Sequence, residues 1–387
     1  MRILFFNYEY PPLGGGAGNA TFCILQEFSK ISGLQVDLIT SSTDKDFHLE
    51  KVGENVTIHK IPIGDKQESL HSQSQKDLVV YTWKAYFYAK KLIKENPYDL
   101  SHSFFTVPCG FISWRFFKKY KIPYVISLRG ADVPGYAERF SFIYKIITPL
   151  IKKIWKDAAQ VIANSQGLKE LALKSNPKQE IGVIYNGIET ERFKPRVELK
   201  DDDKFVITPG ASRLTSRKGL GYLIEAVRKL SKKYPQVKLE IMGDGEEEKM
   251  RLEGIMKKLN LKNEINFLGR IPREETSPYY QRADVFVLPS LNEGMSNAML
   301  EALATGLPIL ATNTGGSKEL IEEGENGYII KKKNPQDIAD KLEKLIKDPE
   351  LRKKMGEASR KKALEMSWEK VAKKYYQVYE KNIYPVK

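Results

Sequence analysis

Two glutamates stand eight positions apart in LNEGMSNAMLEALATGLPILATNTGGSKELI, the segment from residue 291 to residue 321. Glu293 directly precedes a short apolar segment with helical spacing, and Glu301 lies a turn or so into it. We expect this helix to begin near Ser296 or Asn297, so that the backbone N–H groups of its first turn form a site for an anion. Carboxylates beside that site would accept hydrogen bonds from sugar hydroxyls. The pair therefore indicates a diphosphate flanked by two sugars, the ribose of a nucleotide and a transferred hexose.

Two cations could serve the same diphosphate. Arg213 and Lys218 follow an expected strand at 205–211 and stand at the entrance of the next helix. A diphosphate leaving group carries concentrated negative charge, which the planar fork of an arginine and the point charge of a lysine can both stabilise. The same residues would also suit an ordinary exposed basic loop, so the sequence leaves both interpretations open.

The glycine run PPLGGGAGNA, residues 11–20, offers a second place for an anion. It follows a strand and opens a helix, and glycines let backbone N–H groups come close to a phosphate. It does not match a dinucleotide-binding fingerprint, because Thr40 and Ser41 stand where an acidic residue should end the second strand. A tight turn between strand and helix explains the run equally well.

These residues need elements that position them, and the apolar pattern supplies two series of alternating strands and helices. Strands are expected at 2–8, 36–40, 56–61, 100–104, 123–130 and 159–164, and again at 205–211, 237–243, 264–269, 283–290, 307–312 and 326–330. Helical spacing occupies segments between them, including 18–32, 77–95, 110–120 and 140–156. Such alternation predicts two α/β domains, each a doubly wound parallel sheet, with ligands at the carboxyl ends of the strands.

The expected domain organisation follows from this restart of the pattern. We expect a first domain at 1–186, a linker at 187–203, a second domain at 204–366 and a final helix at 367–387 that returns to the first domain. The final helix carries Trp368, Val371, Tyr375, Tyr376 and Tyr379 on one stripe, which needs a surface to cover. The natural site in this arrangement is the cleft between the two domains.

Composition and charge exclude several classes of protein. With 41% hydrophobic and 29% charged residues, the chain is an ordinary globular protein, and it contains no apolar run long enough to span a membrane. Its two cysteines match no disulfide or zinc pattern, which favours the cytoplasm. The net charge is +14, and residues 115–157 hold 10 basic but only 3 acidic side chains. This basic stretch indicates either an anionic surface nearby or simply solvated lysines.

Five ordered segments together resemble the retaining GT-B glycosyltransferases of family 4: YPPLGGGAGNA, YNGIETERFKP, SRLTSRKGLGYLIEAV, EGMSNAMLE and NTGGSKELI. The resemblance implies an α/β, GT-B fold of two Rossmann-like domains that face a cleft, with a nucleotide-sugar donor held mainly by the second domain and an acceptor by the first. It implies no metal and no cofactor. Residues that it implies for the donor are Gly15, Gly16, Arg213, Lys218, Glu293, Gly294, Met295, Ser296, Asn297 and Glu301, with Glu293 on the hexose and Glu301 on the ribose.

One position departs from the family pattern. After the strand at 123–128 the family often has His-Gly-x-Asp, whereas this chain reads SLRGADVPGY, with Arg129 in place of the histidine and Asp132 retained. A guanidinium does not lose its proton in proteins, so Arg129 cannot act as a general base but can bind an anionic acceptor or the leaving phosphate. His102 is the nearest histidine, although a single histidine at a strand end is more often structural. We expect Glu293, Arg129 and Asp132 to be the residues closest to the reaction.

The sequence therefore predicts a cytoplasmic hexosyltransferase that uses a UDP- or GDP-sugar and a hydroxyl acceptor, either a glycan or a lipid-linked glycan. It could lie at the inner face of an anionic membrane, and nucleic acid is not an expected partner. Two alternatives stay open: a nucleotide-sugar 2-epimerase with the same architecture, and a non-catalytic basic protein that binds lipid or nucleic acid. The second alternative accounts for the charge but leaves the two glutamates unexplained.

Overall fold

The computed structural model describes residues 1–65, 73–136, 141–196, 203–210, 213–293 and 295–384. It divides the chain into two compact units. The first unit is formed by Met1–Gly187 and Trp368–Lys387, and the second by Ile188–Ser367. The chain thus enters the second unit after Gly187 and leaves it after Ser367, so the first unit is assembled from both ends of the sequence.

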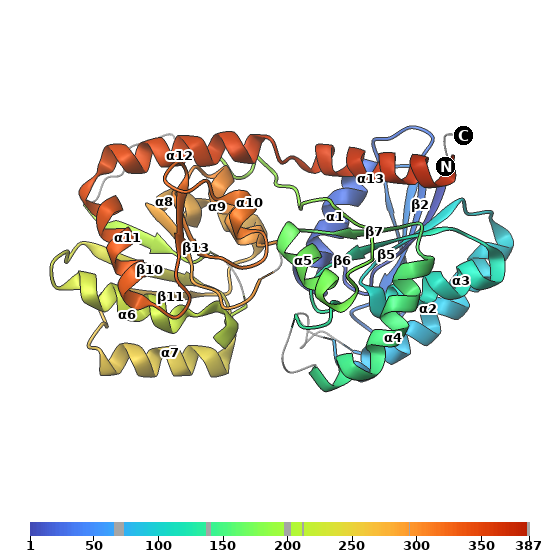
Figure 1. Ribbon diagram of the computed structural model, residues 1–387, viewed down its shortest axis with the longest axis horizontal. Coiled ribbons are helices and arrows are strands. Elements are labelled where there is room, and N and C mark those ends of the chain that lie inside the picture. The colour runs from blue at the N-terminus through green and yellow to red at the C-terminus, as the bar shows by residue number, and fades with distance from the viewer. Residues whose placement is uncertain (66–72, 137–140, 197–202, 211–212, 294, 385–387) are drawn as a thin grey trace. The chain divides into compact units, whose positions relative to one another are not determined.

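The first unit is built on an eight-stranded sheet in the order β3-β4-β2-β1-β5-β6-β7-β8 (Figure 1). All neighbouring strands pair in parallel except β3, which is antiparallel to β4. The strands are β1 (Arg2–Phe6), β2 (Gln35–Ser41), β3 (His48–Val52), β4 (Val56–Ile61), β5 (Leu100–Phe104), β6 (Tyr124–Leu128), β7 (Gln160–Ala163) and β8 (Ile181–Val183). The helices are α1 (Gly16–Phe28), α2 (Gln75–Glu95), α3 (Phe111–Tyr120), α4 (Ser141–Asp157), α5 (Gln166–Ser175) and α13 (Trp368–Ile383).

Alternate residues of the central strand β1 enter two different cores, because side chains on a strand point to opposite faces of the sheet. Ile3 and Phe5 pack with α1 and α13, whereas Leu4 and Phe6 pack with α2 and α3. Further along the sheet, α4 buries Ile151, Ile154 and Trp155. Both faces of the sheet are therefore covered by helices, as expected for a parallel sheet.

The second unit contains a six-stranded, wholly parallel sheet in the order β11-β10-β9-β12-β13-β14. This is the strand order of doubly wound nucleotide-binding folds. Its strands are β9 (Phe205–Thr208), β10 (Val237–Met242), β11 (Ile265–Gly269), β12 (Val285–Leu288), β13 (Ile309–Thr312) and β14 (Gly327–Ile330). Its helices are α6 (Leu220–Ser231), α7 (Glu246–Lys258), α8 (Ser277–Arg282), α9 (Asn297–Ala304), α10 (Ser317–Leu320), α11 (Pro335–Lys347) and α12 (Pro349–Leu364).

The segment expected to link the domains packs on the second unit as far as the structure describes it. Phe193 is fully buried, and the Arg360 guanidinium donates to the carbonyl oxygens of Thr190 and Phe193 at 3.0 and 2.8 Å. The two ends of the second unit also meet here, because the Ile188 N–H donates to the Met366 carbonyl at 2.8 Å. Residues 197–202 of this segment lie outside the described residues. Within the described residues, no helix is long and apolar enough to cross a membrane.

Four elements were not predicted, and in each case the sequence pattern is atypical. β3 reads HLEKV and is largely exposed, and β8 is only three residues long. α5 is a short helix of ten residues, and α12 reads PELRKKMGEASRKKAL with charges on every side. On α4, Ile151 and Ile154 are buried, whereas Ile146 is exposed. The spacing of apolar residues predicts which side chains of a helix are buried only where one face is covered and the other is exposed.

Candidate functional site

The strand order of the second unit brings together the residues that sequence analysis assigned to a diphosphate. β9 and β12 are neighbours although they are far apart in sequence, so their carboxyl ends form the point where the winding of the sheet reverses. Ligands of open α/β sheets bind at such points. The chain after β9 carries Arg213 and Lys218, and the chain after β12 carries Ser290 and Glu293.

A lysine–glutamate pair forms the centre of this site. The Lys218 ammonium donates to Glu293 Oε1 at 2.7 Å, and the Ser290 hydroxyl donates to the same oxygen at 2.8 Å. Both side chains of the ion pair are mostly shielded from solvent. Sequence analysis expected Lys218 on the phosphate and Glu293 on the sugar but did not expect them to bind each other. A donor entering this site must share or replace that ion pair.

The backbone holds the two loops of this site against each other. The Leu291 N–H donates to the Arg217 carbonyl at 2.7 Å. Gly219 has φ of +66°, and a Cβ placed there would lie 2.2 Å from the Pro289 carbonyl oxygen. Only glycine permits this close approach in this conformation. The approach fixes the distance between the lysine loop and the glutamate loop.

The helix after Glu293 begins where the sequence predicts. α9 starts at Asn297, and the Ser296 hydroxyl accepts the Met299 N–H at 3.3 Å as its N-cap. Met295 and Ser296 are both buried. The N-cap takes up the N–H of Met299 and not those of residues 295–297, which are the ones expected to meet an anion. Gly294, also expected at the donor, lies outside the described residues.

Glu301 lies in a separate, buried cluster. It is only 4% exposed, and its oxygens accept hydrogen bonds from Arg273 Nε at 3.2 Å and from the Tyr280 hydroxyl at 2.9 Å. Arg273 also donates to Glu189 at 2.6 Å. Burial raises the pKa of Glu301, and the charge of Arg273 opposes that shift. Each carboxylate oxygen keeps a second lone pair that a ribose hydroxyl could use.

Arg213 differs from Lys218 in its surroundings. It is exposed, and no carboxylate of a described residue forms an ion pair with its guanidinium. Its charge is therefore available to a ligand without breaking an internal contact.

In the first unit, the glycine loop already contains a carboxylate. Glu9 Oε2 accepts the Gly15 N–H at 3.2 Å, next to Gly16, the first residue of α1. Gly14 has φ of +91°, and a Cβ there would lie 2.6 Å from the Glu9 side chain. Burial raises the pKa of Glu9, whereas the N–H groups of Gly15 and Gly18 and the charge of Arg129 lower it. The Gly15 N–H, one of the groups expected to meet an anion, is thus bonded to a carboxyl group of the chain itself.

Arg129 is held by three different parts of the first unit. Its Nη1 donates to the Asn186 side chain at 2.8 Å, and its Nη2 donates to the Tyr375 hydroxyl of α13 at 3.4 Å. The guanidinium carbon lies 3.4 Å from the centre of the Phe104 ring. Burial lowers the pKa of Arg129, and its buried Nε has no hydrogen-bond partner among the described residues. The arginine in the family's histidine position is therefore held in place by the first unit.

Asp132 organises the backbone of this loop. Its Oδ1 accepts the N–H groups of Arg129 and Gly130 at 3.0 and 3.1 Å, and its Oδ2 accepts the Thr106 N–H and hydroxyl at 2.9 and 3.1 Å. Burial raises its pKa, and the backbone N–H donors oppose the rise. With both oxygens doubly occupied, Asp132 holds Arg129 in place.

His102 is fully buried within the sheet. Its Nδ1 lies 2.7 Å from the Tyr379 hydroxyl and its Nε2 lies 2.8 Å from the Ser127 hydroxyl, while its ring stacks on Phe5. Burial lowers its pKa well below the ordinary value, and the charge of Arg129 adds to this. A buried, neutral imidazole with both nitrogens paired has a structural role.

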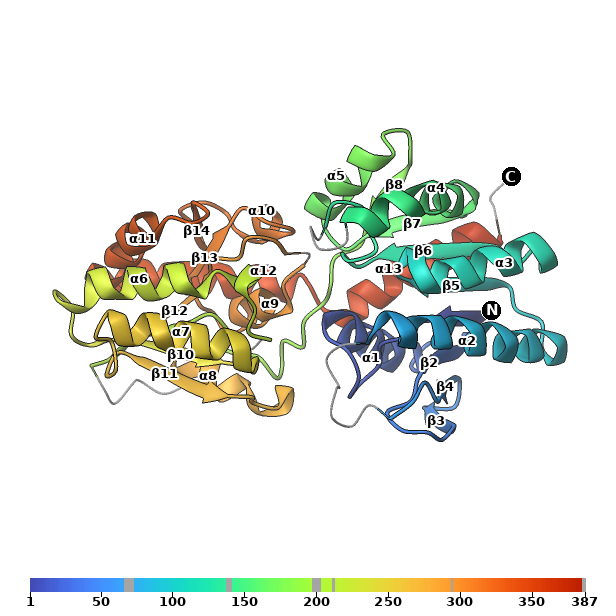
Figure 2. The same ribbon diagram turned by 90° about the horizontal axis from the view of Figure 1, so that it is seen from below.

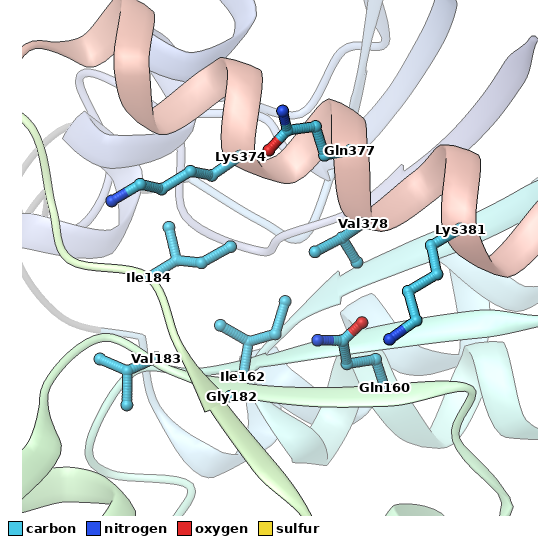
Figure 3. A pocket seen from close by; sticks show the side chains of 9 residues that line it. All are labelled: Gln160, Ile162, Gly182, Val183, Ile184, Lys374, Gln377, Val378 and Lys381. Atoms are coloured by element: carbon cyan, nitrogen blue, oxygen red, sulfur yellow. The ribbon is translucent and has the colours of Figure 1, made fainter.

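A hollow of about 300 Å³ lies elsewhere in the first unit. Figure 3 shows Lys374, Gln377 and Lys381 of α13 beside Ile162 and Gly182 of the sheet edge. None of the expected site residues lines it. Among the described residues, no group of three or more His, Cys, Asp or Glu side chains is arranged to hold a metal ion.

Sequence reasoning missed Glu9, Arg273, Tyr280 and Tyr375, all of which contact expected site residues. Glu9 could have been found, because it is the acidic residue between the first strand and the glycine run, whose free N–H groups attract an anion. The partners of Glu301 and Arg129 come from distant parts of the chain, and no local pattern indicates them.

Comparisons with known proteins agree with this architecture. A model of the family described as glycosyl transferases group 1 matches residues 189–362, and one described as glycosyltransferase family 4 matches residues 14–192. An uncharacterised glycosyltransferase of Methanocaldococcus jannaschii is 28% identical over 382 residues, 98% of each chain.

Solved structures show the same fold. Sucrose-phosphate synthase of Thermosynechococcus elongatus aligns over 98% of both chains, with a TM-score of 0.85 and 22% identity. HepE of Anabaena in complex with UDP-glucose aligns over 97% of this chain and 98% of its own, with a TM-score of 0.74 and 19% identity. The two parallel-sheet units therefore form a GT-B fold. Since the two family models together span residues 14–362, the chain belongs to the glycosyl transferases of group 1 and family 4 and is a transferase.

Proposed function

We propose that this protein is a retaining hexosyltransferase that moves a hexose from a UDP- or GDP-sugar to a hydroxyl acceptor without a metal ion. The observation that carries this proposal is the ion pair of Lys218 and Glu293 at the point where the winding of the second sheet reverses. It supports the proposal because a cation suited to a leaving diphosphate and a carboxylate suited to sugar hydroxyls lie side by side. HepE, which shares the fold, was solved in complex with UDP-glucose, and this supports a donor of the same class.

The chemistry of the step assigns roles to these groups. The bond between the sugar C1 and the phosphate oxygen breaks, and its electron pair stays on the diphosphate. Lys218 and Arg213 stabilise this charge as it develops, which is electrostatic stabilisation of a leaving group. When Lys218 turns to the phosphate, Glu293 is released to accept hydrogen bonds from the hexose. The acceptor oxygen bonds to C1 on the same face, and the departing phosphate oxygen takes its proton, so no protein base is needed.

Calorimetry on two variants tests the division of labour between the glutamates. Glu293→Gln should lower kcat strongly while the sugar-free nucleotide diphosphate binds as before. Glu301→Ala should weaken nucleotide binding by about 1–3 kcal/mol, because it removes a charged hydrogen-bond acceptor, while Arg273 keeps its ion pair with Glu189. If both variants bind the nucleotide like the wild type and still turn over, the assignment is wrong. The anomeric configuration of the product, read by NMR, tests retention separately.

For the first unit, we propose that it binds the acceptor, a glycan or lipid-linked glycan, and that the protein works in the cytoplasm at the inner face of an anionic membrane. Arg129, cationic and held in place by Asn186, suits a negatively charged group on the acceptor. The basic residues of 115–157 suit anionic headgroups, each contributing on the order of 1 kcal/mol near such a surface. Salt-sensitive binding to anionic vesicles, weakened by Lys152→Glu/Lys153→Glu, is the expected result. Binding that ignores the anionic lipid content would leave a soluble acceptor.

A further inference from the structure

The charged side chains on three neighbouring helices of the first unit are almost all positive. α2 packs against α3, and α3 against α4, so the three lie side by side over the sheet (Figure 2). Their carboxylates are confined to helix ends: Asp77 belongs to the buried N-terminal cap of α2, and Glu95 and Asp157 are the last residues of α2 and α4. Between these ends, all the charged residues are lysines or arginines: Lys84, Lys90, Lys91, Lys94, Arg115, Lys118, Lys119, Lys145, Lys152, Lys153 and Lys156.

The same face exposes large apolar side chains. On α2, Val79, Trp83 and Phe87 are 68%, 64% and 50% exposed, and their spacing of four residues places them in one line along the helix. The rings of Trp83 and Phe87 lie 5.1 Å apart. On α4, Phe142 and Ile146 are 72% and 63% exposed. These five residues are here called the apolar stripe.

The stripe and the lysines form one pattern. Lys91 follows Phe87 by one helical turn, and Lys90 and Lys94 lie on the same side of α2. An exposed line of Trp, Phe and aliphatic residues flanked by lysines is typical of helices that lie in a membrane interface. Tryptophan suits that region because its ring is apolar and its N–H can remain hydrated. Soluble proteins tolerate single exposed apolar residues, but an aligned group indicates a contact surface.

We propose that the α2–α3–α4 face docks on an anionic lipid bilayer, with Trp83 and Phe87 inserted among the headgroups and the lysines bound to lipid phosphates. This proposal extends the membrane setting proposed above and does not depend on the chemistry of transfer. Docking of this kind differs from attraction by charge alone, because the apolar stripe enters the headgroup region of the bilayer. A second copy of the chain is a poor occupant, since it would oppose two cationic faces. A single-stranded nucleic acid would use the aromatic rings but not Val79 or Ile146.

Vesicle cosedimentation with the full chain tests the surface. The vesicles contain either phosphatidylcholine alone or about three parts phosphatidylcholine to one part phosphatidylglycerol. Trp83→Ser/Phe87→Ser should weaken partitioning to the anionic vesicles about tenfold, because two anchoring rings are lost. Lys91→Glu/Lys94→Glu should weaken it by at least as much, because two attractive charges become repulsive.

Matched controls change the same chemistry elsewhere. Lys373→Glu/Lys374→Glu alters two exposed lysines of α13, which packs on the opposite face of the first sheet. Met250→Ser/Leu364→Ser removes two exposed apolar residues of the second unit. Both controls should bind vesicles within about twofold of the wild type, since neither touches the proposed face.

Tryptophan fluorescence reports insertion directly. The chain has four tryptophans, and Trp114, Trp155 and Trp368 are buried, so Trp83 is the exposed one. Anionic vesicles should shift the emission to shorter wavelength, and lipids with brominated acyl chains should quench it. Trp83→Phe should still bind but lose both signals.

The outcomes separate the alternatives. Binding without a change in Trp83 emission would contradict insertion and leave attraction by charge. Equal binding of the wild type and both stripe and lysine variants would remove this face from membrane contact. Protection of Trp83 by a single-stranded RNA homopolymer, with no response to vesicles, would make the surface a nucleic-acid site. None of these results bears on donor use, which is measured separately with a soluble nucleotide sugar.

Discussion

The two units place opposite charges at the same position of the same fold. In each sheet, the first strand is followed by a loop that leads into a helix, beside the strand where the winding reverses. In the second unit this loop carries Arg213 and Lys218. In the first unit it carries Glu9, whose carboxylate accepts the Gly15 N–H at the start of α1.

This difference separates what the fold provides from what the residues decide. The topology offers both loops as places for a ligand. The second loop suits the proposed diphosphate, because Lys218 is paired with a single carboxylate, Glu293. The first loop is already satisfied by its own carboxylate, so it suits a hydroxyl-bearing or cationic group better than a phosphate. The resemblance to family 4 implies that Gly15 and Gly16 lie near the diphosphate. A diphosphate bound there would have to share the Gly15 N–H with Glu9 or replace its carboxylate.

The largest expected effect tests the cationic loop. Lys218→Ala should lower kcat by about a hundredfold or more, because it removes a preorganised charge at the leaving group. It also leaves Glu293 without its ion-pair partner. Lys232→Ala, an exposed lysine at the end of α6, should retain wild-type turnover. Steady-state kinetics with a nucleotide sugar measures both. Near-normal turnover in Lys218→Ala would place the leaving group elsewhere.

The next test concerns the contact that holds the second loop. Gly219→Ala should reduce the free energy of unfolding by about 2 kcal/mol, because its Cβ would collide with the Pro289 carbonyl at positive φ. Turnover should fall as well, since the lysine and glutamate loops move apart. Gly254→Ala is the control: it lies inside α7 with nothing near its Cβ, and should raise stability by about 0.5–1 kcal/mol. Urea unfolding of the two variants gives the comparison.

A third test asks whether the carboxylate loop serves the acceptor or the donor. Glu9→Gln should raise the KM for the acceptor about tenfold, because a charged hydrogen-bond acceptor becomes neutral. The affinity for the free nucleotide diphosphate, measured by calorimetry, should stay within about twofold. A marked gain in nucleotide affinity would instead show that Glu9 repels a diphosphate bound at the first-unit glycines.

The smallest effect concerns the buried layer beneath Arg129. Burial keeps the pKa of His102 well below its ordinary value, so the imidazole is neutral in the folded protein and gains a proton on unfolding below pH of about 6.5. The unfolded state then binds more protons, and stability falls as pH decreases, by at most about 1.4 kcal/mol per pH unit. His102→Gln should flatten this slope in urea unfolding at different pH values. The pH–rate profile should show no limb from this histidine; a limb lost in the variant would make it a base.

Much of the fold could be predicted because its strands are buried on both faces. Runs such as VDLIT and ADVFVLPS have no other plausible place in a globular chain. β3 was missed because its residues are largely exposed, and α12 because its charges surround the helix. Sequence periodicity depends on the contrast between a buried and an exposed face, and β3 and α12 show little of that contrast.

The candidate site could be predicted in its residue types but not in its contacts. Glu293, Glu301, Lys218 and Arg129 stand out because charge is unusual beside buried strands and glycine turns. That Lys218 binds Glu293 depends on the approach of Gly219 to Pro289, which only the folded chain shows. Likewise, the partners of Glu301 and Arg129 are brought together by tertiary packing.

The closure of the first unit by α13 has a consequence for synthesis on the ribosome. Residues 188–367 form a unit whose ends meet, so this part can fold as soon as it has emerged. The first unit begins earlier but must wait for the last helix, whose Tyr375 and Tyr379 contact Arg129 and His102. Nascent or prematurely terminated chains therefore carry a folded second unit and an unfinished first unit with an uncovered core. Completion of translation is itself the step that assembles the site around Arg129.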